Sequence, residues 1–451
     1  MEVVNTDSLS PMKHHQTNTV QRLRCSVQNY DWGRKGCESQ VAKLFALNSD
    51  SVEIDPDKPY AELWMGTHES GPSFLVQKWE ESNGILPDDS EATVSLKSWV
   101  LNNPNVLGEK VVQRWGHDLP YLFKVLSVAK ALSIQAHPDK ELAKALHKLH
   151  PNLYKDDNHK PEMALAITHF EALCGFISLE ELKSVLHNVP EIVKLVGSAD
   201  VNQVLQISGF DEKENTKSVL RSVFSKLMSA SQEEIIKATS ELKIRLHLES
   251  QVRQLSDKEM LVLRLEKQYP ADIGVISAFF LNYVKLNPGE ALYLGANEPH
   301  AYIFGDCIEC MATSDNVVRA GLTPKHRDVK TLCSMLTYKQ GYPEILQGVP
   351  LSPYVMRYLP PFDEFEVDRC NLPQGESAAF PAVPGPSIFL VMQGEGTIRT
   401  NSVKGGLISE GNIIAEGDVL FAPANTEISI TSASELQLYR AGVNSRFFQA
   451  T

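Results

Sequence analysis

Long apolar runs are missing from this 451-residue sequence. No stretch of eighteen apolar residues occurs in it, whereas a helix that crosses a membrane needs about 20. We therefore expect no membrane partner. Hydrophobic residues make up 43% of the chain and charged residues 22%, which is typical of a soluble globular protein. The length is sufficient for about two or three domains with complete cores.

Positive charge is also in short supply. The chain has 43 Lys and Arg against 56 Asp and Glu, which gives a formal net charge of −13 at pH 7. A surplus of negative charge argues against a nucleic-acid partner, because binding to a phosphate backbone depends on clustered cations. A small phosphorylated ligand would need a locally basic pocket, since the overall field repels it.

Cysteine is rare, odd in number and scattered, with seven in the whole chain. This usage predicts free thiols in a reducing compartment, hence a cytoplasmic protein. The one CxxC pair is Cys307 and Cys310, and in a strand its two side chains face opposite ways, so we expect no thiol metal site there. Residues 1–20 are polar and lack the apolar segment of a signal peptide, which predicts a disordered N-terminal arm.

The most informative stretch is 131–140 (ALSIQAHPDK). Read as a strand, it directs Ser133, Gln135 and His137 into one space and its apolar side chains into a core. Pro138 ends the strand. Such a row of polar groups on a β-scaffold is typical of a metal or ligand site.

Two later stretches add groups of the same kind. Residues 158–163 (NHKPEM) begin a second strand, because the residue before a proline is held extended, and Lys160 and Glu162 share one face of it. In 296–302 (ANEPHAY) a turn delivers His300. One Gln, two His and one Glu then make a candidate ligand set that suits Zn²⁺.

Polar side chains continue beyond that turn. Tyr302 shares a face with His300, Glu309 is expected on a following strand, and Val317 and Arg319 share the face of one more strand. Charged residues that alternate into an apolar β-region indicate a cavity that they line.

The middle of the chain reads as helical. Three capping-box patterns, with Ser at the cap and Glu three residues later, occur at 178–181, 231–234 and 256–259. The apolar residues that follow the second box recur at helical spacing; they are Ile235, Ala238, Leu242 and Leu246. An earlier helix is predicted over 139–148, with Leu142, Leu146 and Leu149 on one side.

These patterns predict a mainly β protein with an inserted α-helical domain. We expect a β-domain over 21–176 and 274–342, the helical domain over 177–273, and a further β-domain over 343–451. The last part has short strands and turns at regular spacing, which is typical of a jelly roll. It has no histidine, because the final one is His326, so we expect no metal site there.

Five motifs resemble those of the type I phosphomannose isomerase family, in the family's order. They are 27–33 (VQNYDWG), 61–68 (AELWMGTH), 133–140 (SIQAHPDK), 160–163 (KPEM) and 316–325 (NVVRAGLTPK). The resemblance runs from about Leu23 to the C-terminus. It implies a catalytic zinc cupin, a helical domain and a second, metal-free cupin, both cupins being jelly-roll barrels. It places the family's metal ligands on Gln135, His137, Glu162 and His300, and its essential arginine on Arg319.

The resemblance also implies an activity. It is the interconversion of mannose 6-phosphate and fructose 6-phosphate through a cis-enediol(ate), with one Zn²⁺ per chain, which feeds the synthesis of mannose 1-phosphate and GDP-mannose. We expect a cytoplasmic monomer. Arg319 can stabilise the enediolate or hold phosphate, and Glu309 and Asp315 are candidates for proton transfer. The candidates for contacts with the substrate are Ser133, Lys160, Lys325 and Tyr302.

Two other functions compete with this one. A non-catalytic cupin could bind a metal or a sugar, because the fold alone does not decide the chemistry. It would not need an arginine and a proton-transfer carboxylate beside the metal ligands. A metal-dependent dioxygenase would use redox-active iron and more histidines, so a glutamine ligand argues against it.

Overall fold

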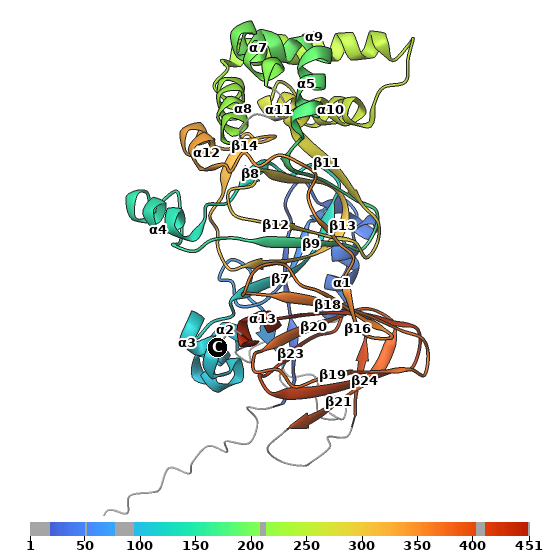
Figure 1. Cartoon of the computed structure of the whole chain (residues 1–451). Helices are drawn as coiled ribbons and strands as arrows, with labels where there is room; N and C mark the ends of the chain where they lie inside the picture. Colours follow the sequence, from blue (N-terminus) through green and yellow to red (C-terminus); the bar gives the residue numbers. More distant parts are fainter. Residues whose placement is uncertain (1–18, 50–51, 77–93, 208–212, 403–410, 450–451) are drawn as a thin grey trace, which may run out of the picture.

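The computed structural model describes residues 19–49, 52–76, 94–207, 213–402 and 411–449. Apart from its last two residues, the predicted arm over 1–20 lies outside the described part. Figure 1 shows helices at one end of the molecule, a β-layer in the middle and a second β-layer at the other end. The predicted fold class, mainly β with inserted helices, is confirmed.

The middle layer is an eleven-stranded sheet. Its strands are β2 (Ser26–Gln28), β5 (Glu62–Met65), β7 (Tyr121–Val128), β8 (Ile134–Ala136), β9 (Glu162–Ala166), β10 (Phe170–Phe176), β11 (Leu281–Leu286), β12 (Ala291–Leu294), β13 (His300–Ala312), β14 (Val318–Gly321) and β15 (Ile345–Leu346). The main path runs β15-β12-β9-β13-β7-β5-β2, while β10 joins β11 to β13 and β8 joins β14 to β13. The long strand β13 therefore holds the whole layer together.

A single glycine lets β13 change its partners. Gly305 has φ +111°, and a Cβ there would collide with the backbone of His169, so no other residue fits. Before this point β13 pairs with β10 and β8, and after it with β7 and β9. His300 and Glu309 thus lie on one strand. The expectation that Glu309 follows on a separate strand is wrong, because the chain bends at Gly305 without leaving the sheet.

The second β-layer consists of an eight-stranded and a four-stranded sheet, with the orders β16-β17-β18-β25-β20-β23-β1-β6 and β19-β24-β21-β22. Their strands are β1 (Gln21–Arg24), β6 (Phe74–Leu75), β16 (Val349–Ser352), β17 (Val355–Tyr358), β18 (Glu366–Leu372), β19 (Ser377–Phe380), β20 (Ser387–Gln393), β21 (Glu395–Ser402), β22 (Asn412–Ala415), β23 (Val419–Ala422), β24 (Thr426–Ser432) and β25 (Leu436–Gly442). β1 and β6 come from the N-terminal part of the chain, whereas β15 of the C-terminal part joins the middle layer. The sheets therefore cross the domain limits expected from the sequence, and these limits stay a prediction.

One hydrophobic core joins the two β-layers. It contains Tyr121 and Phe123 of β7 together with Ile388, Phe421 and Tyr439 of the second layer, and all five are fully or almost fully buried. Their burial stabilises the two layers as a single body, because apolar area is removed from water on both sides.

The helical end is formed by α5 (Leu179–Asn188), α6 (Pro190–Val196), α7 (Ser198–Gln206), α8 (Lys213–Met228), α9 (Gln232–Glu249), α10 (Asp257–Gln268) and α11 (Ile273–Ser277). All three predicted capping boxes are confirmed, with both reciprocal hydrogen bonds present in each, at Ser178, Ser231 and Ser256. The predicted apolar face of α9 is also confirmed, because its four residues are buried.

Shorter elements complete the chain. They are η1 (Gly36–Glu38), α1 (Gln40–Asn48), α2 (Leu96–Asn102), η2 (Pro104–Leu107), α3 (Glu109–Trp115), α4 (Lys140–Leu149), η3 (Ala278–Phe280), α12 (Val329–Met335), α13 (Ser445–Gln449), β3 (Arg34–Lys35) and β4 (Pro59–Tyr60). The helix α4 forms as predicted with Leu146 buried, but Leu149 is 69% exposed. Leu149 is the last residue of this helix, and most of its side chain is in contact with solvent.

Two expectations about composition can be compared with the structure. Of the helices that the structure describes, none combines the length and the apolar composition that a membrane crossing needs. The cysteines are free, and Cys307 and Cys310 are buried in different hydrophobic clusters. The prediction that these two side chains point to opposite faces of a strand is confirmed.

The capping box of α9 makes a testable contribution to stability. We expect Ser231→Ala to lower the free energy of unfolding by about 1 kcal/mol, because the amide of Glu234 loses its acceptor. Urea titration followed by circular dichroism measures this difference. The control is Ser240→Ala, which changes an exposed serine in the interior of the same helix. Equal unfolding curves for the two variants would contradict the prediction.

Candidate metal and substrate site

The candidate metal ligands come from strands that meet at one place in the middle layer. His137 follows β8 directly, His300 begins β13, and Glu162 begins β9. Gln135, in the middle of β8, is paired with His300 on one side and with Arg319 of β14 on the other. The sheet register therefore gathers four predicted ligands and the predicted arginine, although they are far apart in the sequence.

Three of these ligands form a compact buried cluster. The side chains of His137, Glu162 and His300 are 1%, 2% and 1% exposed. Nε2 of His137 lies 3.3 Å from Oε1 of Glu162, and Nε2 of His300 lies 3.3 Å from Oε2. Their ligand atoms all lie within 4.8 Å of one another, a spacing that one tetrahedral ion can bridge.

Backbone carbonyls fix how the two imidazoles are turned. Nδ1 of His137 lies 2.7 Å from the carbonyl oxygen of Asn316, and Nδ1 of His300 lies 3.0 Å from that of Glu298. A carbonyl only accepts, so each Nδ1 carries the proton and donates it. Each Nε2 is then an unprotonated acceptor, and both are buried without a hydrogen-bond partner. Two lone pairs therefore face the Glu162 carboxylate, as in sites where a second partner orients a metal-binding histidine.

The protonation states suit a divalent metal. Burial lowers the pKa of His137 to about 4, even though the charge of Glu162 opposes this shift. Burial alone would raise the pKa of Glu162, but Lys160 and His137 hold it well below its usual range. Nζ of Lys160 lies 3.2 Å from Oε1 of Glu162. At neutral pH the imidazole of His137 is neutral and the carboxylate charged, which are the forms that bind metal.

The donor set fits Zn²⁺. Two imidazole nitrogens and a carboxylate converge, and the side chain of Gln135 lies beside them in the sheet, where its Oε1 accepts a hydrogen bond of 3.3 Å from Ser133. Within the described ranges, no other group of His, Cys, Asp and Glu residues gathers ligand atoms in this way.

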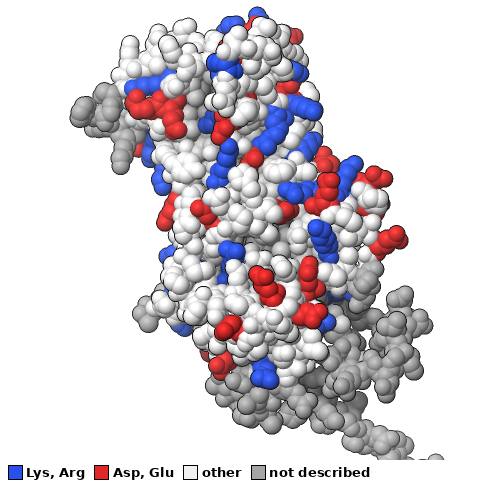
Figure 2. Space-filling view, turned by 90° about the vertical axis from the view of Figure 1, so that its right-hand side faces the viewer, with Lys and Arg blue, Asp and Glu red and all other residues white. Residues whose placement is uncertain are grey.

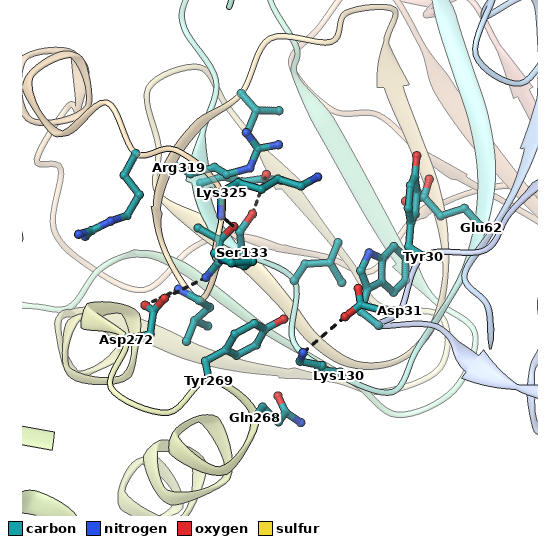
Figure 3. A pocket seen from close by; sticks show the side chains of 18 of the residues that line it. Tyr30, Asp31, Glu62, Lys130, Ser133, Gln268, Tyr269, Asp272, Arg319 and Lys325 are labelled. Atoms are coloured by element: carbon teal, nitrogen blue, oxygen red, sulfur yellow. Dashed lines mark hydrogen bonds and ion pairs between the residues drawn. The ribbon is translucent and has the colours of Figure 1, made fainter. Parts of the chain in front are cut away.

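A pocket of about 850 Å³ opens beside the cluster, and Figure 3 shows many of its side chains. The predicted site residues that line it are Ser133, Gln135, Lys160, Asp315, Arg319 and Lys325. Glu309 and Tyr302 do not line it, and both are about 4% exposed. These two residues reach a bound molecule only through a neighbouring side chain.

Positive charge gathers on the side of the pocket formed by β14 and the loop after it. Arg319, Lys325 and Arg327 line this side. Burial lowers the pKa of the half-buried Arg319 from its usual range, and no carboxylate of the described residues opposes that shift. On the molecular face in Figure 2, by contrast, acidic and basic side chains are interspersed. The pocket thus has the local basic character that the net charge of −13 makes necessary for an anionic ligand.

A buried lysine that the sequence patterns did not reveal, Lys124, also belongs to the site. Its Nζ lies 2.8 Å from Glu309 and 3.2 Å from Glu62, and 4.9 Å from the ring centre of Trp64. Burial opposes its charge, but Glu309 and Glu62 raise the pKa of Lys124 above its usual range. Lys124 lines the pocket. The signal was a single lysine inside the apolar run of β7, which is the criterion that pointed to Glu309 and Arg319.

Asp315 is held by a histidine that the sequence analysis did not assign to the site. His68 Nδ1 accepts a hydrogen bond from the amide of Ser70, so its Nε2 carries the proton and donates to Asp315 at 3.2 Å. This bond lowers the pKa of Asp315. Asp315 and His68 both line the pocket, so the pair can contact a ligand directly.

Models of known families match three parts of the chain. They describe the catalytic domain of type I phosphomannose isomerase over residues 20–179, the helical insertion domain over 195–281 and the C-terminal part over 358–402. Mannose-6-phosphate isomerase 1 and 2 of Arabidopsis thaliana are 64% and 61% identical to this chain, and the alignments cover 95% and 99% of both partners. Mannose-6-phosphate isomerase of Bos taurus is 41% identical over 93% of this chain and 97% of its own length.

Solved structures agree with these matches. A variant of phosphomannose isomerase from Salmonella typhimurium superposes with a TM-score of 0.76 at 28% identity, over 94% of this chain and 99% of its own. A mannose 6-phosphate isomerase bound with zinc and yttrium superposes with the same TM-score, identity and coverage. The protein is therefore an enzyme, and it belongs to the type I phosphomannose isomerase family.

The ligand cluster predicts a clear effect on metal content. We expect His137→Ala to lose zinc, because one of two preoriented nitrogen donors is removed from a buried site. Elemental analysis after gel filtration measures zinc per chain. His187→Ala, an exposed histidine of α5, is the control and should keep the wild-type zinc content. A full equivalent of zinc in His137→Ala would show that the ligand set is wrong.

Proposed function

We propose that this protein is a zinc-dependent aldose–ketose isomerase that interconverts mannose 6-phosphate and fructose 6-phosphate through a cis-enediol(ate). The observation that supports it best is the pairing of two sites. Two unpartnered imidazole nitrogens face a buried carboxylate, and an adjoining pocket has a cationic side. The first suits a metal ion and the second suits a sugar phosphate.

One zinc ion per chain would be held by Gln135, His137, Glu162 and His300. Glu162 is the single charged ligand among them, so the site keeps a formal charge of about +1. When bound, the ion would polarise a substrate oxygen as negative charge develops on it. Lys160, 3.2 Å from Glu162, adds a second positive charge next to this place.

The phosphate would bind on the cationic side of the pocket. Arg319 has a planar fork of donors that matches phosphate oxygens, and Lys325 adds a point charge. Ser133 lines the same pocket and can donate its hydroxyl proton. Tyr302 is buried in the hydrophobic cluster against which the pocket residues Trp32 and Leu132 pack, so we assign it a packing role behind the pocket wall.

Two carboxylates could transfer the proton between the two carbon atoms of the substrate. Asp315 lines the pocket and can act directly, with His68 bonded to it. Glu309 is buried and would act through Lys124, which lies 2.8 Å from it and lines the pocket. Exchange of the transferred hydrogen with deuterated water in Asp315→Asn and in Glu309→Gln would distinguish the two routes.

The cellular setting is part of the proposal. We infer that the enzyme acts as a cytoplasmic monomer on a free sugar phosphate, without a nucleic-acid or membrane partner. The reaction would supply mannose 6-phosphate for the formation of mannose 1-phosphate and GDP-mannose. The free thiols and the negative net charge support this setting.

The direct test is conversion of mannose 6-phosphate to fructose 6-phosphate by the purified protein, before and after a chelator, and again after zinc is restored. We expect activity to disappear with the metal and to return with zinc. A zinc-loaded protein that binds sugar phosphate without converting it would instead be a non-catalytic cupin.

Arg319 separates catalysis from metal binding. We expect Arg319→Ala to keep its zinc and to lose more than about a hundredfold in kcat/KM, because a fixed positive charge beside the reacting oxygens is removed. Steady-state kinetics and elemental analysis on the same sample measure both quantities. The control is Arg399→Ala, an exposed arginine of β21. Wild-type turnover in Arg319→Ala would remove the arginine from the mechanism.

A further inference from the structure

One wall of the pocket comes from the helical insertion. The bridging segment, residues 268–273, connects α10 to α11, and all six of its residues line the pocket. In Figure 3, Tyr269 and Asp272 lie across the pocket from Tyr30 and Glu62. The insertion is therefore a part of the site, and the contacts of this segment indicate what it does there.

The bridging segment is tied to the strand region that carries the metal ligands. Oε1 of Gln268 accepts a hydrogen bond of 3.1 Å from the amide of Ala131, and Oη of Tyr269 donates one of 2.6 Å to the carbonyl of the same residue. Nζ of Lys130 lies 4.3 Å from the centre of the Tyr269 ring, a cation–π contact. These contacts place the segment beside the start of the ligand strand.

Asp272 ties the other end of the segment to the loop after β14. Its Oδ1 accepts hydrogen bonds of 2.7 Å from the amides of Gly274 and Leu322, and its Oδ2 accepts one of 3.0 Å from the amide of Thr323. Leu322 has φ +53°, a left-handed conformation that is costly for leucine. Gly321 packs directly against the backbone of Gly274. The carboxylate thus holds a strained turn in contact with the helical insertion.

The turn that Asp272 holds leads into the cationic side of the pocket. Lys325 and Arg327 follow it, and the amide of Lys325 donates to Oγ1 of Thr323 at 3.1 Å. Lys325 and Arg327 thus follow the Thr323 amide that Asp272 holds by two and four positions in the chain.

Helix capping does not account for this arrangement. Asp272 caps the five-residue helix α11 through the amide of Gly274. To cap α11, Asp272 needs only to accept a hydrogen bond from one of the first amides of that helix. The bonds to Leu322 and Thr323 go to a separate part of the chain and use both carboxylate oxygens.

We propose that Asp272 is a positioning residue for phosphate recognition: through the amides of Leu322 and Thr323 it holds Lys325 where the substrate's phosphate binds. The helical insertion thereby sets the affinity of the site for a phosphorylated sugar. This inference rests on the proposed isomerase function and adds to it a role for a domain whose described residues contribute none of the candidate metal ligands.

The test uses the isosteric variant Asp272→Asn. Its Oδ1 can keep two hydrogen bonds, while the new NH₂ group meets the amide of Thr323, so two donors face each other. We expect the KM for mannose 6-phosphate and the inhibition constant of inorganic phosphate to rise about tenfold. We expect kcat to change less than about threefold and the zinc content to stay that of the wild type. Unchanged KM and phosphate inhibition in folded Asp272→Asn would overturn the proposal.

Asp257→Asn is the matched control. Asp257 belongs to the same helical insertion, pairs with Lys285 at 2.6 Å and lies outside the metal-site pocket. We expect wild-type kinetics from it. An equal rise of KM in both variants would mean a general effect of charge loss in the insertion and would overturn the positioning role.

A double-mutant cycle tests whether Asp272 acts through Lys325. If it does, Asp272→Asn combined with Lys325→Ala raises KM no further than Lys325→Ala alone, because the positioned group is already gone. Effects of the two substitutions that multiply would show independent roles and overturn the proposal. If Asp272→Asn does not fold, Tyr269→Phe replaces it. This change loosens the bridging segment, because it removes the hydrogen bond from Tyr269 to the carbonyl of Ala131. An unchanged KM for mannose 6-phosphate in Tyr269→Phe would contradict the proposal.

The two proposals can fail separately. A wild-type protein without isomerase activity would refute the proposed function. Calorimetric titration of the zinc-loaded wild type and of Asp272→Asn with inorganic phosphate would still test whether Asp272 positions Lys325. We expect the variant to bind phosphate about tenfold more weakly. Equal phosphate affinities would overturn it.

Discussion

The structure depends on a buried carboxylate that two histidines face with unprotonated nitrogens. A charge such as that of Glu162 is costly inside a protein unless it is paired. Lys160 pairs it from one side, and the carbonyls of Asn316 and Glu298 turn His137 and His300 toward it. Each carbonyl belongs to a loop at the end of a strand. The strand ends that carry these loops must therefore be placed accurately, and the surrounding sheet fixes their positions.

The three parts of the chain contribute in different ways. The middle sheet supplies the candidate metal ligands at the ends of β8, β9 and β13. The bend of β13 at Gly305 lets one strand reach both the His137, Glu162 and His300 cluster and the Lys124 charge network. The second β-layer shares a core with β7, so the strand that carries Lys124 has an apolar support on its other face. The helical insertion closes one wall of the pocket with the bridging segment.

Local patterns were sufficient for much of this architecture. Each capping box needs only residues three apart. The alternation and the proline also predicted the ligand strand, but β8 covers only Ile134–Ala136, and Leu132, which was expected in the core, lines the pocket. Contacts between distant residues were harder to predict. The role of Lys124 depends on its ion pairs with Glu62 and Glu309, which come from two other strands. Asp272 bonds to a residue 50 positions away. The glycine at position 305 is a local feature of the sequence. It could not be interpreted alone, because a glycine occurs both at a bend inside a strand and at a turn between two strands.

X-ray absorption at the zinc edge is the most direct test of which side chains bind the metal. For the zinc-loaded protein we predict nitrogen and oxygen neighbours at about 2.0–2.2 Å, with the outer-shell signal of two imidazoles and no sulfur. A sulfur neighbour at about 2.3 Å would contradict the account. It would place the ion at one of the cysteines, away from the carboxylate and the histidines on which the rest depends.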